Sequence, residues 1–210
     1  MEPAAESSAR SELEARAAST PEAPFLFFRE PRGHFGWWSW ARCRRESLSA
    51  SPAGPTETIP RELLEALAGA SEEDRRRGEA LAAAAGPGRR RDVWLSARPL
   101  DRPAELALAC AALAGGWAVV RDPGEGVPAS TFAWARPTLA SGSPPELDEL
   151  TERLGAMAPR WGARRWLSRR LRRLRLVWVE GDDADPGPWR ERFASLGAEA
   201  RVVCFPPGRW

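Results

Sequence analysis

The clearest hydrophobic pattern in the chain lies between residues 143 and 157, where apolar residues recur every three or four positions. This spacing places them on one face of a helix. The four residues are Leu147, Leu150, Leu154 and Met157. Just before them, Ser143 and Glu146 have the spacing of a capping box, in which each side chain bonds the other residue's backbone N–H. We therefore predict a helix that starts after Ser143.

From residue 86 onward, short apolar runs alternate with helical patterns. The runs predict strands at residues 92–96, 117–120, 174–179 and 201–205. Between them, the patterns predict helices at residues 101–113 and 188–196, each followed by glycine. The run at 174–179 is almost continuously apolar, which is typical of a strand buried on both faces. This alternation predicts an α/β fold with a mainly parallel sheet flanked by helices.

The first third of the chain has a different pattern. Apolar residues 25–28 and aromatic-rich residues 34–40 flank a turn and predict a hairpin. Residues 47–60 read as a linker, and Pro60 starts a helix with leucines on one face. The charge run at 72–77 is expected to be a solvated surface. Residues 1–20 read as a disordered or loosely helical tail, so we expect one domain over residues 21–210.

Composition narrows the function classes only slightly. The net charge is +2, and all 31 basic residues are arginine. A charge this small predicts neither a nucleic-acid partner nor an acidic one. Three isolated cysteines without a CxxC motif favour reduced thiols over disulfides or a zinc site. The sequence shows no signal peptide and no apolar stretch of about 20 residues, so we expect a cytoplasmic location.

Several phrases appear in the same order as in a known enzyme class. They are FLFFREPRGHFGWWSWA at 25–41, GPGRRRDVWLSARPL at 86–100, Arg-Pro-Thr at 136–138 and LRLVWVEGDDADP at 174–186. Together they resemble the N-terminal, AMP-binding domain of acyl-CoA synthetases, of the long-chain type. The resemblance implies the fold of part of an adenylate-forming enzyme, with ATP, magnesium and CoA as the class's cofactors.

The departures from that class concern its chemistry. No Ser/Thr/Gly-rich phosphate loop ending in Pro-Lys-Gly precedes Gly86, and the sequence contains no lysine. Arg102 stands where the resemblance implies a histidine, and Glu180 replaces the first glycine of a Gly-Gly loop. The class's magnesium-binding Glu motif has no counterpart after Val203. We therefore predict no catalytic residues and no cofactor, and a vestigial pocket at Arg102, Glu180, Gly181 and Asp182.

These departures favour a degenerate domain that acts as a binding or scaffolding protein, with a protein or a small acyl or nucleotide ligand as partner. A residual acyl-CoA or nucleotide-using enzyme is the weaker hypothesis, because another subunit would have to supply the missing loop.

The segment from Arg160 to Arg175 offers an alternative function. It contains eight arginines, two tryptophans and no acid, a composition that could grip nucleic-acid phosphates or an anionic lipid surface. The candidate anion-binding residues are Arg164, Arg165, Arg169, Arg170, Arg172 and Arg173. Apolar residues at three- and four-residue spacing also allow a purely structural interpretation, in which the helix packs on the sheet and presents its arginines to water.

Other candidate groups have simple structural explanations. His34, the single histidine, is expected to be structural, and the acidic run at 182–185 to form a strand-to-helix turn. No metal site is predicted. Trp37, Trp38 and Trp40 could pack the hairpin or form a partner surface.

Overall fold

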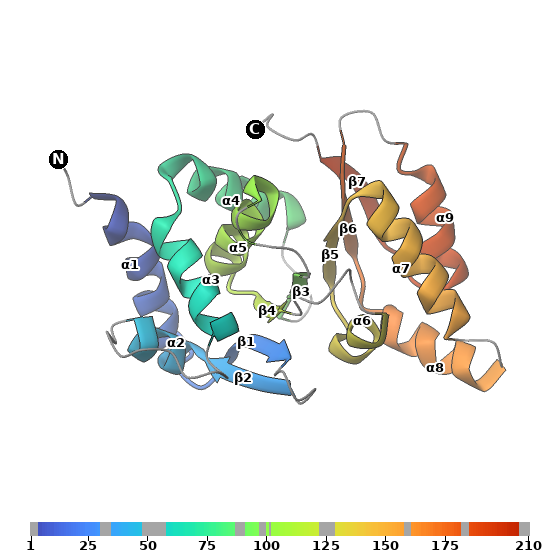
Figure 1. Ribbon diagram of the computed structural model, residues 1–210, viewed down its shortest axis with the longest axis horizontal. Coiled ribbons are helices and arrows are strands. Elements are labelled where there is room, and N and C mark those ends of the chain that lie inside the picture. Colours follow the sequence, from blue (N-terminus) through green and yellow to red (C-terminus); the bar gives the residue numbers. More distant parts are fainter. Residues whose placement is uncertain are drawn as a thin grey trace. The chain divides into compact units, whose positions relative to one another are not determined.

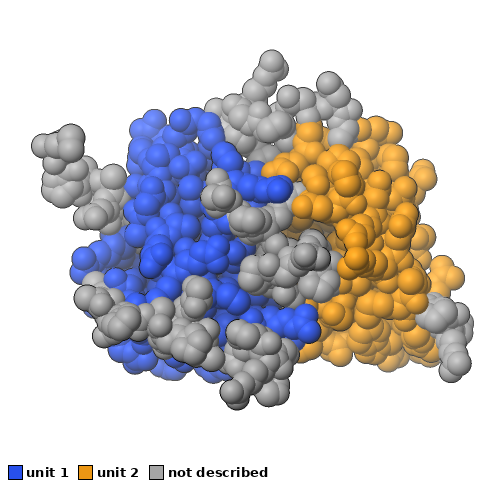
Figure 2. All heavy atoms as spheres, in the orientation of Figure 1, with its two compact units in different colours: residues 1–91, 98–121 blue, residues 92–97, 122–210 orange. Residues whose placement is uncertain are grey.

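The computed structural model describes residues 4–29, 35–47, 58–86, 91–96, 100, 102–121, 129–157, 161–181 and 185–205. Within them the chain forms nine helices and seven strands and divides into two compact units (Figures 1 and 2). Unit 1 comprises residues 1–91 and 98–121, and unit 2 comprises residues 92–97 and 122–210. The single domain expected over residues 21–210 stays a prediction.

Unit 1 contains three strands in the order β2-β1-β4. They are β1 (Pro24–Arg29), β2 (Phe35–Ser39) and β4 (Ala118–Arg121). β1 pairs antiparallel with β2, which confirms the predicted hairpin, and parallel with β4.

The tryptophans of the hairpin divide between the core and the surface. Trp38 and Trp40 are buried, and the ring of Trp40 stacks on Phe25 with a centroid distance of 3.9 Å. Trp37 on β2 is 52% exposed. Hairpin packing therefore accounts for two of the three tryptophans, because successive side chains of a strand point to opposite faces.

Five helices complete unit 1. They are α1 (Ala4–Ser19), α2 (Trp40–Ser47), α3 (Thr58–Gly69), α4 (Glu72–Ala85) and α5 (Pro103–Gly115). The predicted apolar face of α3 is confirmed by its buried leucines. α1 packs against α2, α3 and α5 and buries Leu13 and Ala17, so the segment expected as a tail is a packed helix. Most of the expected linker, residues 48–57, lies outside the described residues.

The charge run at residues 72–77 starts a helix and contains a buried arginine. Ser71 and Asp74 form a capping box that starts α4, and Glu72, Glu73 and Arg76 are exposed. Arg75, however, is 7% exposed and donates from Nε and Nη2 to the carbonyl oxygen of Ala70. The prediction of a wholly solvated run is wrong at Arg75, because this guanidinium is buried and binds the carbonyl of Ala70, just after the end of α3.

Unit 2 contains four strands in the order β3-β5-β6-β7, and its described strand pairs are all parallel. They are β3 (Val93–Ser96), β5 (Leu139–Gly142), β6 (Leu176–Glu180) and β7 (Arg201–Phe205). The first four residues of β6 are buried, as its continuous apolar run predicts. The predicted α/β class with a mainly parallel sheet is confirmed.

The helices of unit 2 are α6 (Ala129–Ala135), α7 (Pro144–Ala156), α8 (Trp161–Leu171) and α9 (Gly187–Ser195). α7 and α9 pack against each other (Figure 1). Between them, Trp189 Nε1 donates to Asp148 Oδ1 at 2.9 Å. The capping box of α7 is confirmed, and its three leucines are buried. Met157 is 37% exposed because α7 ends one residue earlier, so its predicted place on the apolar face is wrong.

Candidate functional site

The carboxyl ends of the parallel strands in unit 2 are the first place to look for a ligand, because α/β sheets bind ligands there. β6 ends at Glu180, which is half-buried and pairs with Phe205 of β7. Gly181 follows with φ 152°, a backbone conformation that favours glycine. The structure thus places Glu180 and Gly181 together at this edge.

Two helices also begin at this edge, and carboxylates of the chain itself bind their first N–H groups. At α7, Glu146 Oε2 accepts from the backbone N–H of Ser143 at 2.8 Å and from its hydroxyl at 2.7 Å. Before α9, Asp185 Oδ1 accepts from the N–H of Gly187 at 2.9 Å. Helix N-termini attract anions, but carboxylates of the chain already bind these two. Together with Glu180, Glu146 and Asp185 make the described part of the edge acidic.

The structure does not place the other two residues of the predicted vestigial pocket, Arg102 and Asp182, at this edge. Arg102 is the exposed N-cap residue of α5 in unit 1, and its side chain makes no capping hydrogen bond. Asp182 and His34 lie outside the described residues. A pocket that includes Arg102 or Asp182 therefore stays a prediction.

The arginine-rich segment forms helix α8 and the turn after it. Leu167, Leu171 and Leu174 are 1–2% exposed, so the predicted packing of this helix through its apolar positions is confirmed. The arginines lie outward: five are exposed and Arg170 is half-buried. The exposed residues are Arg164, Arg165, Arg169, Arg172 and Arg173. Burial of the leucines and exposure of the arginines agree with a solvated face and equally with anion binding.

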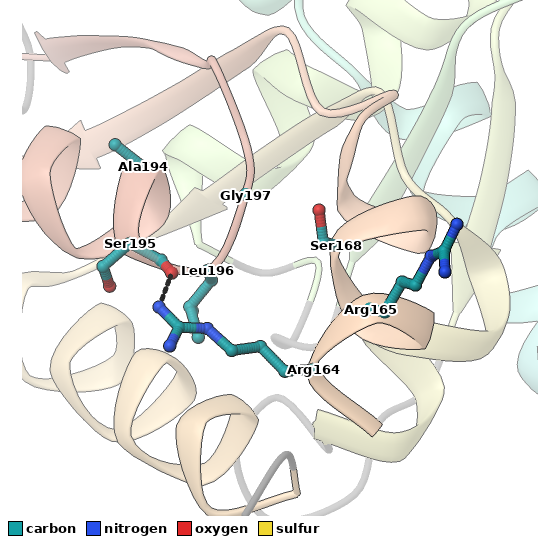
Figure 3. Close-up of a pocket in the computed structure, with 7 residues that line it drawn as sticks. All are labelled: Arg164, Arg165, Ser168, Ala194, Ser195, Leu196 and Gly197. Atoms are coloured by element: carbon teal, nitrogen blue, oxygen red, sulfur yellow. Dashed lines mark hydrogen bonds between the residues drawn. The ribbon is translucent and has the colours of Figure 1, made fainter. Parts of the chain in front are cut away.

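A hollow of about 250 Å³ lies between α8 and the end of α9 (Figure 3). Arg164 points toward α9 and donates to the carbonyl oxygen of Ser195 at 3.3 Å, whereas Arg165 points away (Figure 3). Gly197, with φ 91°, closes this turn so near Ser168 that a Cβ would clash with its hydroxyl. Because the carboxyl end of a helix carries partial negative charge, Arg164 already has a favourable partner there.

A buried polar network joins the amino ends of three strands in unit 2. Asp92 is 5% exposed, and its carboxylate accepts from Arg175 Nε at 2.9 Å and Nη2 at 2.5 Å. The Thr138 hydroxyl donates to Asp92 at 2.8 Å and accepts from the Val93 N–H at 2.8 Å. Three of the sequence phrases that carry the family resemblance therefore meet in space. Since ligands bind at the opposite ends of such strands, this network holds the scaffold together.

Unit 1 has a buried cation that sequence reasoning missed. Arg121, the last residue of β4, has no exposed surface, and its Nη2 lies 3.2 Å from Glu62 Oε1 on α3. An isolated buried charge is costly, and Glu62 offsets that cost. The one available signal was an arginine directly after the apolar run at 117–120.

Two more arginines bind the end of α5. Arg16 of α1 donates to the carbonyl oxygen of Ala114, and Arg91 Nε donates to that of Gly116 at 3.2 Å. Burial, and secondarily the charge of Arg16, lowers the pKa of Arg91. Guanidinium groups at a helix carboxyl terminus stabilise it, so this cationic pair has a structural explanation.

The three cysteines are free thiols, as the sequence predicts. Burial raises the pKa of Cys43 and of Cys110 from 9.0 to about 12 and also raises that of Cys204. Raised values oppose a nucleophilic role, because the thiolate is the reactive form. In the described part of the chain, no group of three or more His, Cys, Asp or Glu residues could hold a metal ion.

No helix among the described residues is long and apolar enough to cross a membrane.

Comparisons with known proteins identify the fold. No family model matches the sequence, and a search of curated proteins finds no match. Structural similarity is nevertheless extensive. The crystal structure of CmiS6 matches with a TM-score of 0.62 and 12% identity, over 93% of this chain and 70% of that one. The N-terminal domain of FACL13 from Mycobacterium tuberculosis matches with a TM-score of 0.60 and 11% identity, over 94% and 75%.

A third match is the o-succinylbenzoate coenzyme A synthetase (MenE) of Bacillus subtilis in complex with ATP and magnesium ion. It has a TM-score of 0.57 and 15% identity, over 89% of this chain and 57% of that one. Identities this low carry information on the fold alone. The chain has the fold of the N-terminal domain of adenylate-forming enzymes.

Proposed function

We propose that this chain is a binding protein that uses the fold of adenylate-forming enzymes without adenylating a substrate. The observation that carries the proposal is the acidic carboxyl edge of unit 2. Glu180 ends β6 there, and the helix N-termini beside it are bound by Glu146 and Asp185.

The electrostatics of adenylation support this proposal. Transfer of a nucleotide group requires cations or backbone N–H groups directed at the phosphate. Glu180, Glu146 and Asp185 instead repel a polyphosphate, and two of them use the N–H groups that would bind it.

The sequence between α2 and β3 supports the same conclusion. It contains helices α3 and α4 and no Ser/Thr/Gly-rich stretch that ends in Pro-Lys-Gly. The usual cradle for phosphates combines converging backbone N–H groups with a lysine. Neither is recognisable in the residues that precede Gly86.

An apolar hollow in unit 1 suggests what could bind instead. Its volume is about 200 Å³, and it lies among α1, α3 and α5. Its lining residues are Arg10, Leu13, Ser47, Leu64, Leu67, Ala68 and Leu113. Sites for drug-sized ligands measure about 300–1,000 Å³, so this hollow suits a short acyl chain. A small acyl ligand without a nucleotide is therefore the ligand we propose.

The first test measures adenylation directly. ATP–pyrophosphate exchange should stay at the no-enzyme background with magnesium and a panel of short- to long-chain carboxylic acids. A complete acyl-CoA synthetase serves as the positive control. Exchange above background, together with stabilisation of the chain by ATP and magnesium, would refute the proposal.

The second test addresses the hollow. Octanoate should raise the unfolding midpoint of the wild type, because a ligand that binds the native state stabilises it. Ala68→Phe, which fills the hollow from an exposed position, should abolish this shift. Glu65→Phe, at an exposed position of α3 that does not line the hollow, is the matched control and should keep it. Equal shifts in both variants would exclude the hollow as the binding site.

A further inference from the structure

Several arginines on helices α1, α4 and α7 are paired with carboxylates one turn away. The pairs are Arg10–Glu14, Arg16–Glu12, Arg76–Glu72, Arg77–Glu73 and Arg153–Glu149. Such spacing neutralises each helix locally. A high arginine content therefore does not by itself create a positive surface in this protein.

Helix α8 is the exception among the described helices with several surface arginines. Its sequence contains no Asp or Glu, and the first acid after it is Glu180. Within the described residues, Arg169, Arg170, Arg172 and Arg173 form no ion pair with a carboxylate. With Arg164 and Arg165 these residues form what we name the α8 patch. The positive charge of Arg169, Arg170, Arg172 and Arg173 is left for an external anion to neutralise.

The way α8 is packed determines which anion can use the patch. Its leucines are 1–2% exposed, so the apolar face of the helix lies against the protein. An amphipathic helix binds a membrane by burying that face in the lipid, and here the face is already occupied. Among the described side chains of α8, the patch therefore offers charge and the ring of Trp166, which is 43% exposed.

Trp166 lies within the field of arginines. The guanidinium carbon of Arg170 is 5.2 Å from the centre of its ring. Proteins that bind single strands without sequence preference combine cationic side chains for the phosphates with aromatic rings on which unpaired bases stack. A base held in a duplex cannot stack on a side chain in this way.

We propose that the α8 patch binds single-stranded nucleic acid, with the arginines on the phosphates and Trp166 against a base. The eleven residues of α8 span about 16 Å, so the site contacts only a few nucleotides and reads no sequence. Each phosphate contact on a single strand lowers the logarithm of affinity by about 0.7 per logarithm of salt. Four to six contacts therefore predict a slope of about −3 to −4.

The test is fluorescence anisotropy of a labelled 12-nucleotide single strand with the full chain, at salt concentrations from 50 to 300 mM. Arg169→Glu/Arg173→Glu should lower affinity by more than tenfold and flatten the salt slope. Arg44→Glu/Arg190→Glu changes the net charge equally at exposed positions outside the patch and should leave affinity within twofold. Trp166→Ala should lower affinity about tenfold and leave the slope unchanged.

Circular dichroism and the unfolding midpoint establish that each variant is folded. Loss of binding in a folded patch variant, with binding kept in the control, supports the proposal. In the anisotropy assay, any of three results would overturn the proposal. These are no binding by the wild type at 50 mM salt, equal loss of affinity in both charge-reversal variants, or tighter binding to a duplex than to the single strand. Sedimentation with phosphatidylserine vesicles in the absence of strand binding would also overturn it, in favour of a membrane partner.

Discussion

The network around Asp92 offers the sharpest test of how unit 2 is held together. Replacing Asp92 by alanine removes the carboxylate that Arg175 and Thr138 bind and leaves the guanidinium beside a small cavity. Asp92 precedes β3, and its partners precede β5 and β6, so one substitution affects three strand ends.

The expected loss of stability follows from burial. Removing one partner of a buried ion pair costs about 3–5 kcal/mol. The Arg175 side chain remains 28% exposed, so water can solvate it in part, and we expect about 2–3 kcal/mol for Asp92→Ala. Asp92→Asn keeps an acceptor for the Thr138 hydroxyl and should cost about 1–2 kcal/mol.

Urea unfolding followed by tryptophan fluorescence measures both values. The control is Glu149→Ala, which breaks an exposed pair with Arg153 and should cost no more than about 0.5 kcal/mol. Arg175→Met in the Asp92→Ala background should recover part of the loss, because it removes the guanidinium that has lost the Asp92 carboxylate. The reasoning is refuted if Asp92→Ala stays within about 0.5 kcal/mol of the wild type.

Four further predictions concern unit 1 and the thiols. Gly78→Ala should destabilise the chain, measured by thermal unfolding, because its Cβ would lie 2.5 Å from that of Cys110. Arg16→Ala should cost about 0.5–1 kcal/mol in urea unfolding by uncapping α5; no loss would contradict that role. Ellman's reagent should modify Cys204 in the native protein, and the other two thiols only on unfolding. Since folding raises the pKa of Cys43 and Cys110 from 9.0 to about 12, stability should be full below pH 9 and fall between pH 9 and 12; a flat profile over that range would contradict it.

Sequence patterns predicted the elements whose signals are local. The capping box before α7, the continuous apolar run of β6 and the spacing of the α8 leucines all correspond to observed burial. Helix α1 was missed as a packed element because, from Arg10 to Ser19, only Leu13 and Ala17 are buried, and they pack against helices up to about 100 residues away. Such a weak apolar pattern indicates a tail unless its partners are known.

The candidate site was less accessible to sequence reasoning. The family resemblance pointed to Glu180 and Gly181, and the apolar run placed them at the end of a strand. The capping box predicted the bond between Glu146 and the Ser143 N–H. The acidic run at 182–185 did not show which of its carboxylates would bind the N–H of Gly187, since that bond depends on local backbone geometry. The sequence pattern also could not separate Arg169, Arg170, Arg172 and Arg173, which form no ion pair with a described carboxylate, from paired arginines elsewhere without reading the acids one turn away.

The position of β3 in the chain has a consequence for fragments of this protein. β3 belongs to unit 2, yet the residues on both sides of it belong to unit 1. A fragment starting at residue 122 would therefore lack the strand that pairs with β5, exposing Leu139 and Ala140 as an unpaired edge. It would also lack Asp92, leaving Arg175 without its carboxylate. Unpaired edges promote aggregation, so unit 2 should be soluble by itself only if residues 92–97 are supplied, in the same chain or as a separate peptide.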